Sequence, residues 1–301
     1  MGLNRDYIGR EYDPIIHTVT EEEIKEYAWA IGARNLTYFN YNGSISPVGP
    51  KGMAPPSYAV VYELPILERL WSDPNLHGGE EEAKKNVLML VHGEQQMRFY
   101  KPIRPGDKLA FRIKITDIED KGSGEFLVFK VVTTNGSSES VVESEWGLFI
   151  RGIGSGQKSQ KSNREEKQPA DNEDPELAFR RIIRVPNDIT YRYAEAAHDK
   201  NPIHIDDEVA KKAGLNGIIV HGLCTMSMAM RAIIECYTES DPSKLMQLGV
   251  RFSSPVYPGD ILSIDAWELG KKGENTLLGF EVKRKIDDVR VIKGGTAEVA
   301  I

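Results

Sequence analysis

A ten-residue pattern occurs twice in this chain of 301 residues, and it constrains the fold more than any other feature. Residues 98–107 read RFYKPIRPGD, and 153 residues later residues 251–260 read RFSSPVYPGD. The recurrence of arginine, phenylalanine, proline, glycine and aspartate at the same spacing indicates an internal duplication. We therefore expect two similar halves, most simply joined face to face as a pseudo-dimer.

Each half shows helical patterns first and alternating, strand-like patterns afterwards. Thr20 and Glu23 have the spacing of a capping box, which begins a helix. In the first half we expect helices at 20–33 and 57–71 (the second kinked or split at Pro65), a loop at 73–85, and strands at 109–116, 125–134 and 140–150. In the second half we expect helices at 187–196, capped by Asn187, and at 222–236, and strands at 261–268, 276–285 and 289–301. This order predicts the α+β class for both halves.

The segment between the halves is almost free of apolar side chains. Residues 152–176 read GIGSGQKSQKSNREEKQPADNEDPE, a composition that cannot bury enough surface to offset the entropy lost on ordering. Its three glycines are not followed by a helix signal, so they do not form a dinucleotide-binding fingerprint. The sequence predicts a first domain at 1–151, a flexible linker at 152–176 and a second domain at 177–301.

The charge balance argues against two classes of partner. Acidic residues (45) outnumber lysine and arginine (38), and the net charge is −7, so we expect neither a nucleic acid nor an anionic membrane as partner. Apolar runs stay far below the ~20 residues that a membrane-spanning helix needs. The opening MGLNRDYIGREYD has no apolar signal core, and the closing EVAI is not a peroxisomal address.

The two cysteines, Cys224 and Cys236, inform the expected compartment. If both lie on the helix expected at 222–236, they are ~18 Å apart at ~1.5 Å per residue. A disulfide needs Cα atoms within ~7 Å, so these cysteines cannot pair with each other. Unpaired cysteines are typical of a reducing compartment, and we expect a cytoplasmic protein.

Polar residues capable of acid–base chemistry gather in one stretch of the second half. Asp199-x-Asn201-Pro202-x-His204 places a carboxylate, an amide and an imidazole around a proline that ends a helix. A carboxylate and an imidazole that share one water make a general acid/base pair, and the amide can hold the water or a substrate oxygen. Downstream, His221-Gly222 precedes a helix, where the glycine amide can donate to a developing oxyanion. Together these groups suit the addition of water β to a thioester, or its loss.

Simpler interpretations remain open for each of these residues. Asp-x-Asn-Pro is also the pattern of an Asx turn after a helix, and His204 alone could be a hydrogen-bonded core histidine. His198, His204 and His221 do not have the spacing of a usual zinc site, so we expect no metal. Of the remaining histidines, His17 and His77 have the sequence context of surface residues, and His92-Gly93 could mimic His221-Gly222 but leads into a strand rather than a helix.

The motif closely resembles that of a known family. Asp199-x-Asn201-Pro202-x-His204-x-Asp206, followed by Ala213-Gly214 and by Val220-His221-Gly222-Leu223-Cys224, is similar to the hydratase-2 motif of the MaoC-like dehydratases. These are (R)-specific 2-enoyl-CoA hydratases and 3-hydroxyacyl thioester dehydratases. The resemblance implies a double hotdog, in which each of two repeats is a long helix wrapped by a curved antiparallel sheet. The first half, with Ala54-Pro55-Pro56 before its central helix, resembles the companion domain of such proteins.

The resemblance also implies roles for individual residues. Asp199 and His204 would be the catalytic pair that activates water, Asn201 the third polar member and the Gly222 amide the oxyanion donor, while His221 and Leu223 would contact the substrate. No cofactor is implied. Two positions depart from the family: Ala197-His198 stands where Ser-Gly is common, and Ile218 stands where Pro is frequent. Aligning the two halves places Ala33, Asn35 and Tyr38 opposite the three polar residues, so we expect one active site per chain, in the second half.

The expected activity is reversible hydration of a trans-2-enoyl-CoA to the (3R)-3-hydroxyacyl-CoA, with an acyl-CoA thioester as substrate. Two alternatives stay open: a hotdog acyl-CoA thioesterase, and a subunit that binds acyl-CoA without turning it over. The protein would be a monomeric pseudo-dimer or a homodimer of that unit.

Overall fold

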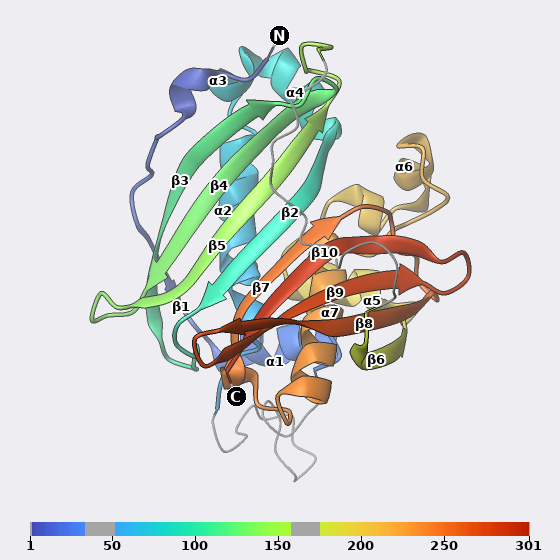
Figure 1. Ribbon diagram of the computed structural model, residues 1–301. Coiled ribbons are helices and arrows are strands. Elements are labelled where there is room, and N and C mark those ends of the chain that lie inside the picture. The colour runs from blue at the N-terminus through green and yellow to red at the C-terminus, as the bar shows by residue number, and fades with distance from the viewer. Residues whose placement is uncertain (1, 34–51, 158–174, 301) are drawn as a thin grey trace.

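The structure, a computed structural model, describes residues 2–33, 52–157 and 175–300 (Figure 1). Ten strands form one antiparallel sheet in the order β1-β3-β4-β5-β2-β7-β10-β9-β8-β6. In the view of Figure 1, the long helix α2 (Val60–Trp71) lies behind the strands of the first half, and α7 (Gly222–Tyr237) packs against those of the second. The expected double hotdog of the α+β class is confirmed.

The other elements follow the order expected from the duplication. The first half contains β1 (Ile15–Thr18), α1 (Glu21–Ala30), α3 (Pro74–His77), α4 (Glu80–Leu88), β2 (Leu90–Phe99), β3 (Lys108–Asp120), β4 (Gly124–Thr134) and β5 (Ser140–Arg151). The second half contains β6 (Leu177–Arg184), α5 (Ile189–Ala196), α6 (Asp207–Lys212), β7 (Leu245–Phe252), β8 (Ile261–Lys272), β9 (Asn275–Arg284) and β10 (Val289–Val299). Short 3₁₀ helices are η1 (Arg5–Tyr7), η2 (Pro56–Ala59), η3 (Pro202–His204) and η4 (Pro242–Lys244). The expected strands are confirmed, whereas β1, β2, β6 and β7 were not assigned from the sequence.

The start of α1 shows how local sequence sets an element. The Glu23 amide donates to the Thr20 hydroxyl at 3.2 Å, and the Thr20 amide donates to the Glu23 carboxylate at 3.0 Å. The predicted capping box is therefore confirmed. The helix ends at Ala30 rather than Ala33.

The loop expected at 73–85 is wrong, because this segment forms α3 and most of α4. Asp73 caps α3 by accepting from the Asn75 amide, and three glutamates occupy the first turn of α4, where the helix dipole favours them. His77, expected at the surface, is buried, and both of its ring nitrogens have partners there: Nε2–H donates to the Trp71 carbonyl at 2.7 Å and Nδ1 accepts from the Asn86 amide. The polar residues of this segment stabilise helix ends and hydrogen-bond a buried imidazole, and they do not form a loop.

Three smaller expectations also need correction. Pro65 does not split α2, which continues through it. Asp188 rather than Asn187 occupies the N-cap of α5, and its side chain makes no capping hydrogen bond. His17, expected at the surface, is partly buried, with its Nε2 at 3.2 Å from the Tyr58 hydroxyl and its ring stacked on Tyr62.

The two halves are joined edge to edge rather than face to face. β2 pairs antiparallel with β7, placing Gln95 opposite Val250 and Met97 opposite Leu248. The pairing satisfies the backbone groups of two strands that would otherwise be sheet edges. The face-to-face expectation is wrong because a shared ladder, which leaves no signature in side chains, joins the halves instead.

A second connection lies in the helical layer. The Tyr27 hydroxyl of α1 is 2.9 Å from the Ser57 hydroxyl and 3.1 Å from the Ser227 hydroxyl of α7. The Tyr27 ring also contacts the Tyr193 ring of α5. These buried contacts fix the helices of one half against those of the other.

The segment expected to be a linker lies mostly outside the described residues, because residues 158–174 are not described. The domain boundaries therefore stay a prediction. Both cysteines are free, as expected. No helix in the described part of the chain is long and apolar enough to cross a membrane.

Removing the Tyr27 hydroxyl should weaken the joint between the helices. We expect Tyr27→Phe to lower the free energy of unfolding by about 1 kcal/mol, because two buried serine hydroxyls lose a partner. Denaturant unfolding measures the change. Tyr191→Phe is the matched control, since that ring is 52% exposed and its substitution should have no effect. Equal effects of the two substitutions would contradict a stabilising role for the contact.

Candidate active site

Asp199 lies in a short loop that leaves α5 with an unusual backbone conformation. His198 has a φ of 57°, in the left-handed region, and so turns the chain sharply before Asp199. Left-handed backbone costs an L-residue with a Cβ about 1 kcal/mol or more. This explains why glycine is common at this position in the family that the motif resembles. The imidazole of His198 is exposed.

The loop then re-enters a helical turn that presents His204. The side-chain carbonyl oxygen of Asn201 accepts a hydrogen bond from the Ile203 amide at 3.3 Å, and Pro202 begins η3. This contact is that of an Asx turn, as the simpler interpretation of the sequence predicted, and the Asn201 side chain is exposed. η3 places His204 inside the protein, with 8% of the residue exposed.

His221 and Gly222 come from the start of α7. The Val220 amide donates to the Val256 carbonyl, which fixes the segment before the helix, and His221 is the N-cap. A Cβ on Gly222 would lie 3.3 Å from the ring of Phe252, so a side chain here would crowd that ring. The Gly222 amide is among the first of the helix, which have no partner within it.

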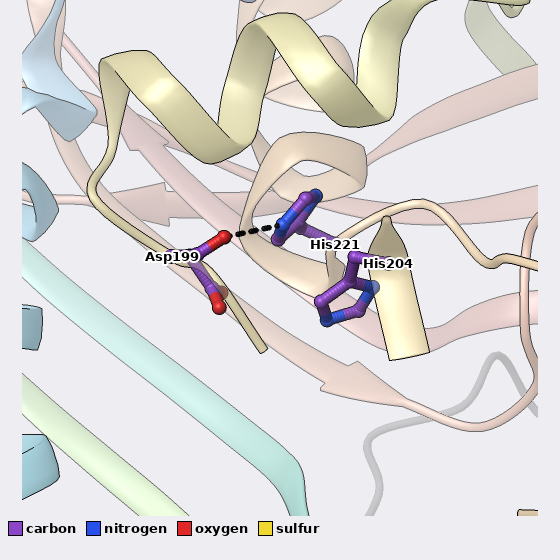
Figure 2. Close-up of side chains that lie close together, drawn as sticks. All are labelled: Asp199, His204 and His221. Carbon is purple, nitrogen blue, oxygen red and sulfur yellow. Dashed lines mark hydrogen bonds between the residues drawn. The ribbon is translucent and has the colours of Figure 1, made fainter. Parts of the chain in front are cut away.

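Figure 2 shows how these elements bring three side chains together. The rings of His204 and His221 stack with centroids 3.8 Å apart, and single polar atoms of Asp199, His204 and His221 all lie within 4.8 Å of one another. Asp199 and His204 are five residues apart in the chain, and His221 lies 17 residues beyond His204; Leu223 follows as a buried residue of α7.

The hydrogen bonds fix the tautomer of each ring. His204 Nδ1 lies 2.8 Å from the Ile219 carbonyl, and His221 Nε2 lies 3.1 Å from the Asp199 backbone carbonyl. A carbonyl only accepts, so the hydrogen sits on Nδ1 of His204 and on Nε2 of His221. His204 therefore keeps the lone pair of Nε2. His221 is 1% exposed and ties the Asp199 loop to the start of α7.

Burial governs the ionisation of all three groups. It raises the pKa of Asp199, an effect that the charge of His204 opposes. Burial lowers the pKa of His204, and the charge of Asp199 and the hydrogen bond to the Ile219 carbonyl partly offset this effect. Burial also lowers the pKa of His221 well below the ordinary value. At neutral pH the imidazoles are therefore neutral, and the carboxylate is a stronger base than an exposed one. This combination suits proton transfer with a bound water.

The first half contributes a carboxyl group that the sequence did not single out. Burial, together with the charge of Asp199, raises the pKa of Glu68 on α2 to about 7. Glu68 stands in an apolar helical run, where a glutamate normally faces solvent, so no sequence signal connected it with Asp199. Glu68 of α2 therefore lies within electrostatic reach of the site in the other half.

The same three side chains are the one cluster in the described residues with the composition of a small metal site. Each histidine already donates one ring N–H to a carbonyl, and the remaining His221 Nδ1 is buried without a partner. A cation would be held by Asp199 and the remaining nitrogens of the two rings. The opposite site in the first half is described only in part, since Asn35 and Tyr38 lie outside the described residues and Ala33 is a buried core residue.

Comparison with known proteins agrees with the geometry. Residues 165–289 match the MaoC like domain, and residues 6–144 match the FAS1-like dehydratase domain region. The probable enoyl-CoA hydratase 2 of Dictyostelium discoideum is 28% identical over 292 residues, covering 96% of this chain and 94% of that protein.

Two further relatives bear on the extent of the similarity. The peroxisomal multifunctional enzyme type 2 of Mus musculus is 33% identical over 190 residues, which are 62% of this chain and 25% of that enzyme. The match therefore spans only about a quarter of that relative's length. The crystal structure of a MaoC-like dehydratase from Phytophthora capsici aligns over 99% of both chains, with 26% identity and a TM-score of 0.77.

The strain at His198 can be measured by comparing two substitutions. We expect His198→Gly to unfold with a free energy about 1 kcal/mol higher than His198→Ala, because only glycine adopts the left-handed backbone without cost. Denaturant unfolding of both variants gives the difference. At Arg69, exposed within α2, the same comparison should have the opposite sign, since glycine weakens a helix interior. A less stable glycine variant at position 198 would show that the turn carries no strain.

Proposed function

We propose that this chain, which belongs to the MaoC-like dehydratases, catalyses the reversible hydration of a trans-2-enoyl-CoA to the (3R)-3-hydroxyacyl-CoA. The observation that carries the proposal is the pairing of the Asp199 carboxylate with a neutral His204 whose Nε2 is free to exchange a proton. The relatives named as enoyl-CoA hydratase and dehydratase support the reaction class, which is that of a hydro-lyase.

In the proposed reaction, one water lies between Asp199 and His204. One of these groups accepts a proton from the water while the oxygen bonds to Cβ of the enoyl thioester. The π electrons of the double bond shift toward the thioester, whose oxygen gains charge. The proton then moves from the pair to Cα, which restores the carbonyl and both catalytic groups. Because one pair on one side of the substrate handles both fragments of water, they add to the same face.

The oxyanion formed on the way needs a donor. The Gly222 amide stands at the start of the 16-residue helix α7, where the helix dipole favours negative charge. An amide held in place before the reaction begins stabilises the enolate without reorganisation. The Phe252 ring, which a Cβ on Gly222 would meet at 3.3 Å, would help to hold that amide in position.

The remaining assignments follow from this site. Asn201 would steady the water or a substrate oxygen, and His221 would position the Asp199 loop beside the substrate. The first domain, 1–151, would be catalytically degenerate and would form a wall of the acyl site through α2, with residues 152–176 as the linker to the domain at 177–301. We retain a cytoplasmic location, which the two free cysteines support, and a monomeric pseudo-dimer or a homodimer of it.

Asp199→Asn tests the proposed role most simply. We expect the rate of crotonyl-CoA hydration, followed by loss of enoyl absorbance, to fall about 10³-fold, because the amide cannot exchange the proton. Asp207→Asn is the matched control, since that carboxylate is exposed and pairs with Lys211. Release of free thiol by the unaltered protein would instead support a thioesterase. Substrate binding without turnover in both proteins would support a binding subunit.

The same variant should be more stable than the unaltered protein at neutral pH. Burial raises the pKa of Asp199 above its unfolded value, so the folded state binds this proton more tightly than the unfolded state. The resulting contribution to stability is fully present below the unfolded pKa and is lost as pH rises through the folded pKa. We expect Asp199→Asn to melt at a higher temperature at pH 7, and the difference to close below about pH 4, near the ordinary pKa of a carboxyl. A lower melting temperature at pH 7 would show that the carboxylate stabilises the loop.

A further inference from the structure

The core of the first half contains a cluster of polar side chains that the proposed reaction does not use. The buried Glu63 carboxylate of α2 accepts from the Ser144 hydroxyl at 2.9 Å and from the Trp146 indole N–H at 2.8 Å. The ring of His92 stacks on Trp146 with centroids 5.0 Å apart. Gln95 is 0% exposed, and neither its Nε2 nor its Oε1 makes a hydrogen bond of good geometry among the described residues, although its amide lies close enough to His92 to raise the pKa of that imidazole against the effect of burial.

The duplication provides an internal control for this cluster. At the repeat offset of 153 residues, Leu248 corresponds to Gln95. Gln95 is opposite Trp146 in the β2–β5 ladder, and Leu248 is opposite Ala297 in the equivalent β7–β10 ladder. The second half thus fills the same place with apolar side chains. The fold does not require an amide here, and a buried amide without a partner costs about 1–3 kcal/mol.

The cluster adjoins the proposed oxyanion donor. The His92 ring meets the Phe252 ring edge to face with centroids 5.2 Å apart, and Phe252 packs on Gly222. One aromatic ring therefore separates the cluster from the amide that would hold the thioester oxygen. His92, Phe252 and Gly222 are each partly exposed, so this side of the site communicates with solvent.

The cluster offers neutral hydrogen-bonding groups. Burial lowers the pKa of His92 to about 4, and its Nε2–H donates to the Glu94 carbonyl at 3.1 Å, so the ring is uncharged. The Gln95 amide presents one carbonyl acceptor and an NH₂ donor, which complement the N–H and the C=O of another amide. A thioester of a phosphopantetheine-type carrier has such an amide two carbons from its sulfur, close to the reacting carbonyl.

We propose that Gln95 is a specificity-determining residue that hydrogen-bonds the carrier-arm amide nearest the thioester sulfur, with His92 lining the same subsite. This inference rests on the proposed function, since it assumes a thioester at Gly222. It gives the buried Gln95 amide a hydrogen bond of good geometry when substrate is bound, and it uses the partly exposed side of the site as the path of the carrier arm. The subsite distinguishes biological carriers from simple thiols.

Two small thioesters isolate this hydrogen bond. Crotonyl-N-acetylcysteamine contains the amide, and S-pentyl crotonthioate has the same length without it. We expect the unaltered protein to hydrate the amide-containing thioester with a kcat/KM about tenfold higher, a net difference of about 1.4 kcal/mol. Gln95→Leu, which installs the residue of the second half, should lower kcat/KM for that thioester alone and bring the ratio close to one.

Gln96→Leu is the matched control, because Gln96 is the next residue of β2 and its side chain packs beside Gly249 on the other face of the sheet. It should leave the tenfold ratio unchanged. An equal loss of kcat/KM on both thioesters in Gln95→Leu, or the absence of any preference in the unaltered protein, would overturn the proposal.

Binding separates failure of this proposal from failure of the proposed function. Calorimetry with butyryl-N-acetylcysteamine and S-pentyl butanethioate needs no turnover, so the preference and its loss in Gln95→Leu can be measured even if no enoyl thioester is hydrated. Gln95→Met, of similar length, replaces the leucine variant if that variant does not fold. We expect a raised melting temperature in either variant without ligand. A lowered melting temperature with an unchanged preference would identify Gln95 as structural and overturn the proposal.

Discussion

The pairing of β2 with β7 determines which residues of the first half can reach the site in the second. A β-ladder has a fixed register, so pairing Gln95 with Val250 places the whole of the first half relative to α7. It places the His92 ring against the Phe252 ring. In the helical layer, the hydrogen bonds of Tyr27 with Ser57 and Ser227 hold the helices of the two halves against each other. The surroundings of the candidate site therefore depend on the assembled pseudo-dimer, although its three polar side chains all come from the second half.

Within that frame, the polar groups of the site are held at a cost to stability. Asp199 and His204 are both buried enough to disfavour their charged forms, and His198 holds a left-handed backbone with a Cβ. The clamp between His221 Nε2 and the Asp199 carbonyl keeps the loop in place despite these penalties. Costs of this kind are expected where proton transfer needs a base of raised pKa.

Much of the site was accessible from the sequence because its elements are local. The spacing of Asp199, Asn201 and His204 around Pro202, and of His221 before a helix, depends on chain geometry over a few residues, as does the Thr20–Glu23 capping box. The duplicated RF-x-x-P-x-x-PGD pattern gave the two halves in the same way.

The features that escaped prediction depend on contacts between distant segments. Glu68 and Gln95 look like ordinary helix and strand residues until the first half is placed against the second. His77 is buried by Trp71 and Asn86, neither of which marks it in the sequence. The edge-to-edge joint rests on backbone hydrogen bonds, which any side chains can accompany.

The central claim is that Asp199 and His204 act together on one water at one face of an enoyl thioester. The stereochemical course of hydration tests it most directly. Crotonyl-CoA hydrated in deuterated water should give (3R)-3-hydroxybutyryl-CoA, with the deuterium at C2 added to the same face as the oxygen at C3. Deuterium at C2 on the face opposite the oxygen, or distributed over both faces, would contradict a single water handled by this pair, and a (3S) product would contradict the proposed face of addition.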